Sequence, residues 1–439
     1  MKFDTALMMM LLVAGGGGIA PIIKPSHAFS YRALPAGTVN LSSSVERDVY
    51  AMADWAAGYG VQQAEGVQLT SYDGRDYFPM TSTYIPAGSP VMYVPADLTF
   101  SSTKSALEFG MSLSTCEDQL ARANLGDKVP LFRIFFKIVS EYEKGMDSPW
   151  YPWLNSLPRI YNTGASMTYA CFDCLPPYAA YLALSERQNF VNFQKAIRNG
   201  PFGEEILKNV TVLKWAYNVA LTRSIDVGGG NGGERVIAPL ADMFNHGTET
   251  EVEVSVDAST GDCYAYATVD VPPGSQLRVS YGDPTDPTPL FARYGFLDES
   301  SPGTFCKLMS MRMEMETLGY TFANLLFYRE NGGISPEVYD VVLYHVLLDS
   351  DPQGAADGFY RAVIGGDEST KAQYHDQYWS YTKTELQKHV DGTLRDLDRW
   401  STKANSYDLN THPRVPLILQ HNAFVKDTFL RVKANLDVM

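Results

Sequence analysis

Two kinds of hydrophobic pattern follow one another in the first half of the chain. Between residues 45 and 100, short β-rich runs are broken by turn residues such as Tyr72-Asp73-Gly74, a pattern that predicts short strands. Residues 104–215 change to helical spacing, and the apolar positions that recur there include Leu131, Phe135, Ile138 and Tyr142. We therefore expect a β segment followed by a long helical segment.

Strands return after the helical segment. Runs of β-branched and aromatic residues mark residues 252–256, 264–271 and 277–281, and Pro272-Pro273-Gly274 separates the last two as a turn. Because two β segments flank the helical one, the pattern predicts one β domain that is split by a helical insert.

The last third of the chain, beyond about residue 302, is predicted to be helical. Ser335-Pro336-Glu337 is typical of a helix start. Apolar residues then recur at helical spacing and indicate core-facing stripes. The stripes are formed by Val338, Val341, Val342 and His345, by Leu386, Val390, Leu394, Leu397 and Trp400, and by Ile418, Val425, Phe429, Val432 and Leu436.

The composition is that of an ordinary globular protein with an acid excess. Of the 439 residues 45% are hydrophobic, and 50 acidic against 35 basic side chains give a net charge of −15. Duplex binding draws most of its affinity from Lys and Arg side chains that neutralise phosphates. We therefore expect no nucleic-acid partner, and the charge favours a basic protein partner.

Two motif-like stretches have simpler structural interpretations. The glycine run at residues 228–233 matches the dinucleotide fingerprint, but it follows a helical stretch and opens no helix, so we interpret it as a loop. Cys171-Phe172-Asp173-Cys174 has metal-ligand spacing, but no second pair completes four ligands. The five cysteines are few and odd in number, which indicates a reducing compartment. We expect no metal site.

The amino terminus has the pattern of a targeting sequence. Residues 6–23 are uncharged and mostly apolar, and Ser26-His27-Ala28 precedes a possible cleavage point, which predicts a signal peptide over residues 1–28. A membrane anchor is the competing interpretation, but four glycines and Pro21 disfavour a helix there. Residues 29–45 contain four serines and no acidic residue, as in transit peptides.

Several short motifs stand in a definite order in the middle of the chain. They are Ser148-Pro149-Trp150-Tyr151-Pro152-Trp153 with Leu157-Pro158, Trp215-Ala216 with Thr222-Arg223-Ser224, Asp242-x-x-Asn245-His246, and Tyr281-Gly282 followed thirteen residues later by Tyr294-Gly295-Phe296. In this order and spacing they resemble the SET domain of the Rubisco large-subunit methyltransferase class. The helical last third matches the substrate-binding domain of that class in position and type.

The resemblance implies an α+β fold. Residues 46–300 would form the SET β-fold, with a helical subdomain inserted at about 104–215, and residues 301–439 would form an all-α substrate-binding domain. It also implies a protein-lysine N-methyltransferase that uses S-adenosyl-L-methionine and requires no metal.

The resemblance assigns roles to six residues. Arg223, Asp242, Asn245 and His246 would bind the cofactor, with Arg223 near its carboxylate and Asp242 bracing the turn. The hydroxyl of Tyr281 would orient the lysine amine, and Tyr294 would form a wall of the channel. An apolar aromatic channel lowers the pKa of that amine from about 10.4, so Tyr281 need not act as a base.

The likeness is incomplete on the side expected to hold the cofactor. Phe78 and Pro79 stand where the class has a Gly-x-Gly turn, Thr83 stands for an Arg, and Tyr93 stands where many members have Glu. A non-catalytic SET-fold binding module is therefore a second hypothesis. Histidine methylation is a third, since the broader class also performs it.

The expected partner is a lysine-bearing protein, and we expect a monomer without a membrane anchor after processing. Ala28-Phe29 resembles the junction in two-part targeting sequences of algae such as diatoms, whose plastids lie inside the endomembrane system. The leader would then direct the chain through the ER into the plastid stroma. A secreted or endomembrane protein is the alternative.

Overall fold

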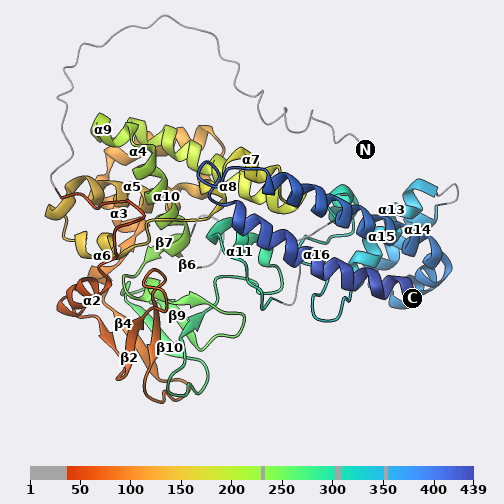
Figure 1. Ribbon diagram of the computed structural model, residues 1–439, viewed down its shortest axis with the longest axis horizontal. Helices are drawn as coiled ribbons and strands as arrows, with labels where there is room; N and C mark the ends of the chain where they lie inside the picture. The colour runs from red at the N-terminus through yellow and green to blue at the C-terminus, as the bar shows by residue number, and fades with distance from the viewer. Residues whose placement is uncertain (1–36, 229–232, 302–307, 351–353) are drawn as a thin grey trace, which may run out of the picture.

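The computed structural model describes residues 37–228, 233–301, 308–350 and 354–439 (Figure 1). The predicted signal peptide, most of the transit-like segment, most of the glycine run and Cys306 lie outside these ranges. Within the described ranges, no helix combines the length and apolar character needed to cross a membrane.

The strands form small sheets at one end of the molecule (lower left in Figure 1). The largest sheet has the order β1-β4-β10-β9 and is antiparallel throughout. Its strands are β1 (Gln62–Gln63), β4 (Pro90–Val94), β9 (Val252–Val256) and β10 (Cys263–Ala267). The smaller sheets pair β2 (Val67–Thr70) with β3 (Phe78–Thr81), join β5 (Phe100–Ser101), β7 (Glu234–Ile237) and β6 (Ile225–Val227), and pair β8 (Asn245–His246) in parallel with β11 (Arg278–Val279).

The helical insert lies above the sheets in Figure 1 and is built around α5 and α10. Its helices are α3 (Ser102–Phe109), α4 (Met111–Arg122), α5 (Val129–Lys144), α6 (Tyr151–Ser156), α7 (Tyr169–Phe172), α8 (Pro177–Ala196), α9 (Glu204–Lys208) and α10 (Val210–Arg223). The prediction of a β domain split by helices is confirmed, since β4 pairs with β10 across the insert.

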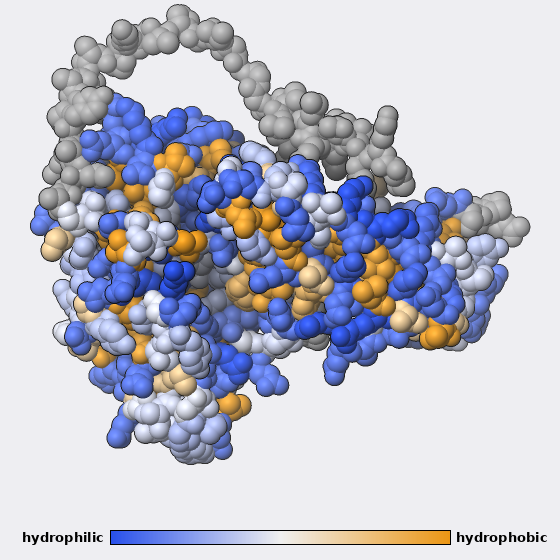
Figure 2. Space-filling model, in the orientation of Figure 1, coloured by the Kyte–Doolittle hydropathy of each residue, from blue (hydrophilic) through white to orange (hydrophobic). Residues whose placement is uncertain are grey.

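The C-terminal helices extend away from the sheets, to the right in Figure 1. They are α11 (Pro287–Tyr294), α12 (Arg312–Thr317), α13 (Pro336–Ser350), α14 (Ala355–Gly365), α15 (Glu368–Asn405) and α16 (Val415–Val438), and α15 packs along α16. Most residues of the predicted stripes are buried, with Val338, Leu386 and Phe429 at 0% exposure, whereas His345, Leu394 and Trp400 are partly exposed. Figure 2 shows orange hydrophobic patches over these helices between blue hydrophilic surface.

One local prediction is wrong. Residues 45–100 are not strands throughout, because α2 (Val49–Gly58) is a helix. The Asp48 carboxylate accepts the Ala51 backbone N–H at 3.1 Å and caps the helix. Met52 and Ala56 are buried at 0% exposure, and α2 packs on α6. The secondary structure of this segment is therefore determined by its burial against α6 and not by its local β-rich composition.

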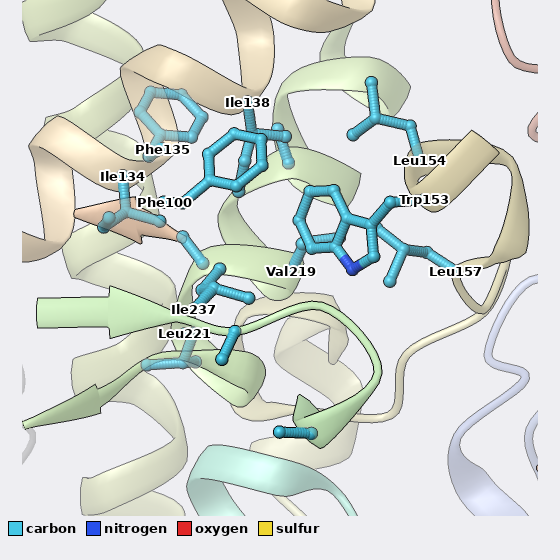
Figure 3. Packing of buried hydrophobic residues seen from close by; sticks show 14 of the residues in the cluster. Phe100, Ile134, Phe135, Ile138, Trp153, Leu154, Leu157, Val219, Leu221 and Ile237 are labelled. Carbon is cyan, nitrogen blue, oxygen red and sulfur yellow. The ribbon is translucent and has the colours of Figure 1, made fainter. Parts of the chain in front are cut away.

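Two hydrophobic cores stabilise the protein. The first lies between the sheets and the insert, where Phe100 and Trp153 approach with ring centroids 4.7 Å apart beside Ile134, Phe135 and Val219 (Figure 3). The second joins the C-terminal helices to α7, α8 and α11. The insert thus contributes to both cores, and this holds α11 and Tyr294 at its end in a fixed place.

Candidate active site

A cleft of about 530 Å³ lies where the end of α10, the segment before β8 and the segment after β11 meet. Four of the six predicted site residues line it: Arg223, Asp242, Tyr281 and Tyr294. The other two, Asn245 and His246, form β8, whose parallel partner β11 ends two residues before Tyr281. The structure therefore brings all six residues into one region.

Arg223 and Asp242 form a buried ion pair at the cleft. Arg223 Nη1 donates to Asp242 Oδ2 at 3.1 Å and to the Asp242 carbonyl oxygen at 2.8 Å. Trp153 Nε1 donates to the same Oδ2 at 3.1 Å. Burial opposes the charge on Arg223, but the neighbouring Asp242 and Tyr161 outweigh it and raise the pKa of Arg223.

The turn that carries Asp242 is strained. It begins at Leu240, a non-glycine residue with φ 76°, and such conformations cost on the order of 1–3 kcal/mol. Leu240 is 1% exposed, and Trp153 belongs to the buried aromatic cluster of Figure 3. The first core therefore fixes the direction of the Asp242 carboxylate.

The ring of His246 is held by the protein on both sides. The backbone N–H of Tyr281 donates to Nδ1 at 3.1 Å, so the ring proton is on Nε2, which contacts Asp298 Oδ2 at 3.3 Å. Burial opposes the charge of Asp298, but hydrogen bonds from Ser300 and Thr248 lower its pKa. The ring of His246 therefore bridges two segments of the protein, and its contact with a cofactor stays a prediction.

Asn245 lies beside the segment that departs from the class pattern. Its Nδ2 donates to Asp76 Oδ2 at 3.2 Å. Phe78 and Thr83 do not line the cleft: Phe78 packs on Tyr72, and the Thr83 hydroxyl donates to the Glu65 carbonyl at 2.7 Å. These two bulky replacements leave the cleft open.

Tyr93 does not line the cleft. Its ring contacts Tyr264, with centroids 5.3 Å apart, and it lines a second groove that shares no lining residue with the cleft. The expectation that this departure affects cofactor binding stays a prediction.

Tyr281 has a fixed hydroxyl and a fixed ring. The hydroxyl donates to the Phe244 carbonyl oxygen at 2.5 Å, and the ring packs on Tyr294 at 4.6 Å between centroids. Burial raises the pKa of Tyr281 above its ordinary value. The hydroxyl is therefore neutral at physiological pH, with its proton on the Phe244 carbonyl and its oxygen lone pairs available as acceptors.

Gly295 sets the position of Tyr294. It caps α11 in the left-handed conformation, with φ 77°, and a Cβ there would lie 2.3 Å from the Asn162 carbonyl carbon. Only glycine permits this approach, so the Tyr-Gly-Phe motif has a packing reason.

Sequence reasoning missed Arg47, which lies just before α2. Its Nε donates to the Ser156 carbonyl at 2.6 Å, and both Arg47 and Arg223 point a guanidinium nitrogen at Met243 Sδ, at 3.7 and 3.6 Å. Burial and the nearby Arg223 lower the pKa of Arg47 to about 10. No local pattern marks this residue, because its partners come from distant segments.

Three buried polar atoms at the site have no hydrogen-bond partner among the described residues. They are Arg223 Nε, Asp242 Oδ1 and the Tyr161 hydroxyl. An unpartnered donor and an unpartnered acceptor on the two members of one ion pair suit a ligand that carries both a carboxylate and an ammonium group. No group of His, Cys, Asp and Glu in the described ranges is arranged to hold a metal ion.

The architecture and site together define a SET-domain fold. Solved structures of Rubisco LSMT share it: the SET domain of LSMT bound to lysine and AdoHcy has a TM-score of 0.58 at 14% identity, covering 89% of this chain and 91% of that one. Rubisco LSMT bound to AdoMet has a TM-score of 0.56 at 14% identity, covering 90% and 92%. The resemblance to this class is confirmed at the level of the fold.

Sequence relatives point to the same domain. SET domain-containing protein 4 of Artemia parthenogenetica is 24% identical over 180 residues, which are 38% of this chain and 44% of the relative. The Homo sapiens protein of the same name is 23% identical over 188 residues, which are 39% and 42%. The matches thus span less than half of these relatives, and no protein-family model matches the chain.

Proposed function

We propose that the chain is an S-adenosyl-L-methionine-dependent protein-lysine N-methyltransferase that acts on a non-histone protein. The single observation that carries the proposal is the cleft in which Tyr281, Tyr294 and the Arg223–Asp242 pair meet. Solved neighbours of the same fold bind AdoMet, AdoHcy, lysine or methyl-lysine, which supports this choice of cofactor and substrate.

The residues present fit the amino-acid end of such a cofactor. Arg223 Nε is a donor for a carboxylate, and Asp242 Oδ1 is an acceptor for an ammonium group. Asn245 would contribute its amide and His246 its backbone, since both ring nitrogens of His246 have protein partners. When bound, the cofactor supplies a methyl group on a positively charged sulfur.

Tyr281 and Tyr294 prepare the substrate amine. Because the Tyr281 hydroxyl donates to the Phe244 carbonyl, its oxygen faces the amine as an acceptor and orients it. The two rings exclude water, which lowers the pKa of a lysine amine from about 10.4 and favours the neutral nucleophile. Positioning of this kind lowers a barrier by as much as about 7–11 kcal/mol.

Part of the cleft lining suits a cationic side chain. Glu253 lines it together with the aromatic rings of Tyr281 and Tyr294, whereas Asp226 is already paired with Arg235 at 2.8 Å. Aromatic faces attract ammonium groups by about 0.5–2 kcal/mol. This combination favours a lysine over a neutral side chain.

Two measurements test the proposal. Calorimetry of residues 29–439 with S-adenosylhomocysteine should give saturable binding, and incubation with labelled S-adenosylmethionine and stromal proteins should label a lysine. Absence of binding would contradict the enzyme and favour the non-catalytic SET-fold module. Label that is recovered on histidine would favour histidine methylation.

We also propose a plastid location, which rests on the leader pattern of residues 1–45. A fluorescent protein fused behind these residues and expressed in a diatom should accumulate in the plastid. Fluorescence in the ER or the medium would support the secreted alternative.

A further inference from the structure

A tyrosine-lined groove lies on the outer face of the main sheet. Tyr93 on β4 is the cross-strand partner of Tyr264 on β10, and their ring centroids are 5.3 Å apart. Tyr264 stacks on Tyr266 at 6.0 Å with an angle of 17° between the rings. These three side chains line a groove of about 530 Å³ together with Gln62 and Gln63 of the edge strand β1. We call it the tyrosine groove.

This aromatic row is exposed, although large apolar rings are normally buried. Tyr266 is 40% exposed, and Tyr93 and Tyr264 are partly exposed. The sheet end of the molecule is mostly pale in Figure 2, in contrast to the orange and blue of the helical part. Tyr faces on an accessible surface are suited to stacking and to cation contacts.

The charge around the tyrosine groove is acidic. Partial desolvation and the neighbouring Asp262 raise the pKa of both Tyr93 and Tyr264, and Asp97 adds to the effect at Tyr93. No charged side chain of either sign is among the residues that line the groove, and the acidic residues lie at its border: Asp262 directly precedes β10, and Asp97 follows the end of β4 by three residues. The groove therefore complements a positively charged segment.

The tyrosine groove adjoins the active-site cleft. Glu253 on β9 lines the cleft, and its cross-strand partner is Tyr266, which lines the groove. Cross-strand partners lie on the same face of a sheet, about 5 Å apart. An extended chain that leaves the cleft over Glu253 therefore passes directly onto Tyr266 and Tyr264.

We propose that the tyrosine groove binds an extended, arginine- or lysine-bearing segment of the protein substrate, next to the lysine held in the cleft. This rests on the proposed function for the identity of the cleft. The distance from β9 across β10 to β4 is two strand spacings, together about 10 Å. About three residues of extended chain span this distance. The groove thus selects targets with a second basic residue within about six positions of the modified lysine.

A binding experiment with a lysine-free probe tests the groove separately from catalysis. The probe is a short fluorescein-labelled peptide with two arginines between glycines, measured by fluorescence anisotropy on the full chain. We expect saturable binding that weakens at least about five-fold in the Tyr264→Ala/Tyr266→Ala double variant. The matched control is Tyr50→Ala, because Tyr50 is 68% exposed on α2 and outside the groove.

The outcomes separate the two proposals. The groove proposal is contradicted if the peptide binds the double variant as tightly as wild type. It is also contradicted if a peptide with glutamine in place of arginine binds equally well. Unchanged S-adenosylhomocysteine binding and unchanged thermal unfolding of the double variant establish that the cleft and fold are intact. If the peptide binds but no methyl transfer to a protein is found, the groove stays supported as a binding site for basic segments, and only the enzymatic proposal is contradicted.

Discussion

The hydroxyl of Tyr281 donates to the carbonyl oxygen of Phe244 at 2.5 Å, and this bond joins the segment after β11 to the segment before β8. The Tyr281 backbone N–H meets His246 Nδ1 in the same region. Tyr281 thus bonds to Phe244 through its side chain and to His246 through its backbone. Both bonds fix its ring at the cleft.

Replacing Tyr281 by Phe should slow methyl transfer at least about 100-fold, because the amine loses its orienting acceptor. The free energy of unfolding should fall by about 1 kcal/mol, since the Phe244 carbonyl loses its partner. Single-turnover kinetics and urea unfolding measure the two effects. Tyr50→Phe is the control, and equal rates for Tyr281→Phe and wild type would remove Tyr281 from its assigned role.

Arg223→Lys should weaken S-adenosylhomocysteine binding about ten-fold or more. Lysine keeps the positive charge beside Asp242. It has no group at the position of the arginine Nε, the donor that we assign to the cofactor carboxylate. Calorimetry measures the affinity. Arg235→Lys is the control: Arg235 is about as buried as Arg223 and pairs with Asp226 at 2.8 Å, although the Asp226 side chain is 47% exposed. A similar loss in both variants would argue against the specific role of Arg223.

Sequence alone predicted the elements whose burial follows a regular period. The stripes of α15 and α16 could be predicted because buried apolar residues, such as Val390 on α15 and Phe429 on α16, recur along each helix at helical spacing. The helix α2 was not readable, since its formation depends on burial of Met52 and Ala56 against a distant helix. Local composition carries no record of such a contact.

The six site residues were predicted only as a spaced set of motifs, and their roles stay a prediction. Their partners were beyond reach because they come from far along the chain: Asn245 meets Asp76 across 169 positions, and Arg47 meets Met243 across 196. The contacts of the His246 ring could not be predicted either, because its two nitrogens bind Asp298 and the Tyr281 backbone N–H, which lie far along the chain.

Gly295→Ala should be strongly destabilising. The new Cβ would lie 2.3 Å from backbone atoms of Asn162 in addition to the strain at φ 77°. Gly274 has a similar φ of 84° with open space around it, so Gly274→Ala isolates the conformational cost of about 1–2 kcal/mol. In urea unfolding we expect Gly295→Ala to lose at least about 2 kcal/mol more than Gly274→Ala. Equal losses would contradict the close packing of α11.

Acid should destabilise the C-terminal helices through His421. This residue is 0% exposed beside Phe291, and burial lowers its pKa to about 4. The unfolded chain binds the proton near pH 6.5, so the stabilisation is complete above about 6.5 and is lost as the pH falls toward 4. The full loss is about 3 kcal/mol.

Chemical unfolding at about pH 7.5 and 4.5 checks this expectation. His421→Gln should show a smaller drop between the two pH values than wild type, whereas His345→Gln should not, because His345 is partly exposed and contacts Glu314. The same drop in wild type and His421→Gln would assign the acid sensitivity to other groups. Burial also lowers the pKa of His389 to about 4, so a part of the drop should remain.

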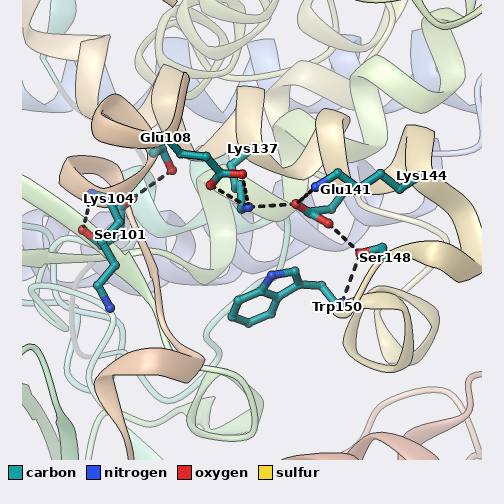
Figure 4. A network of polar contacts seen from close by, with 9 residues as sticks. Ser101, Lys104, Glu108, Lys137, Glu141, Lys144, Ser148 and Trp150 are labelled. Carbon is teal, nitrogen blue, oxygen red and sulfur yellow. Dashed lines mark hydrogen bonds and ion pairs between the residues drawn. The ribbon is translucent and has the colours of Figure 1, made fainter. Parts of the chain in front are cut away.

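The buried carboxylate of Glu141 joins α5 to Ser148 in the segment before Trp150 (Figure 4). It is 0% exposed and accepts from Lys137 Nζ at 2.7 Å, Lys144 Nζ at 2.6 Å and Ser148 Oγ at 2.7 Å. Burial raises its pKa, but these hydrogen bonds outweigh burial and keep the pKa low. Ser148 in turn accepts the Trp150 N–H at 3.0 Å, at the start of the segment that carries Trp153.

Glu141→Gln should therefore cost about 1.5–3 kcal/mol of unfolding free energy, because a buried charge-assisted network loses its charge, while Lys137 keeps Glu108 and Lys144 reaches water. Glu108→Gln is the control: Glu108 also binds Lys137, but its side chain is 42% exposed, so its loss should cost about 1 kcal/mol or less. Since Trp153 holds the Asp242 carboxylate, Glu141→Gln should also weaken S-adenosylhomocysteine binding, whereas Glu108→Gln should not. Unfolding by guanidinium and calorimetry at one temperature measure both. A Glu141→Gln protein that unfolds like Glu108→Gln would show that this network does not support the site.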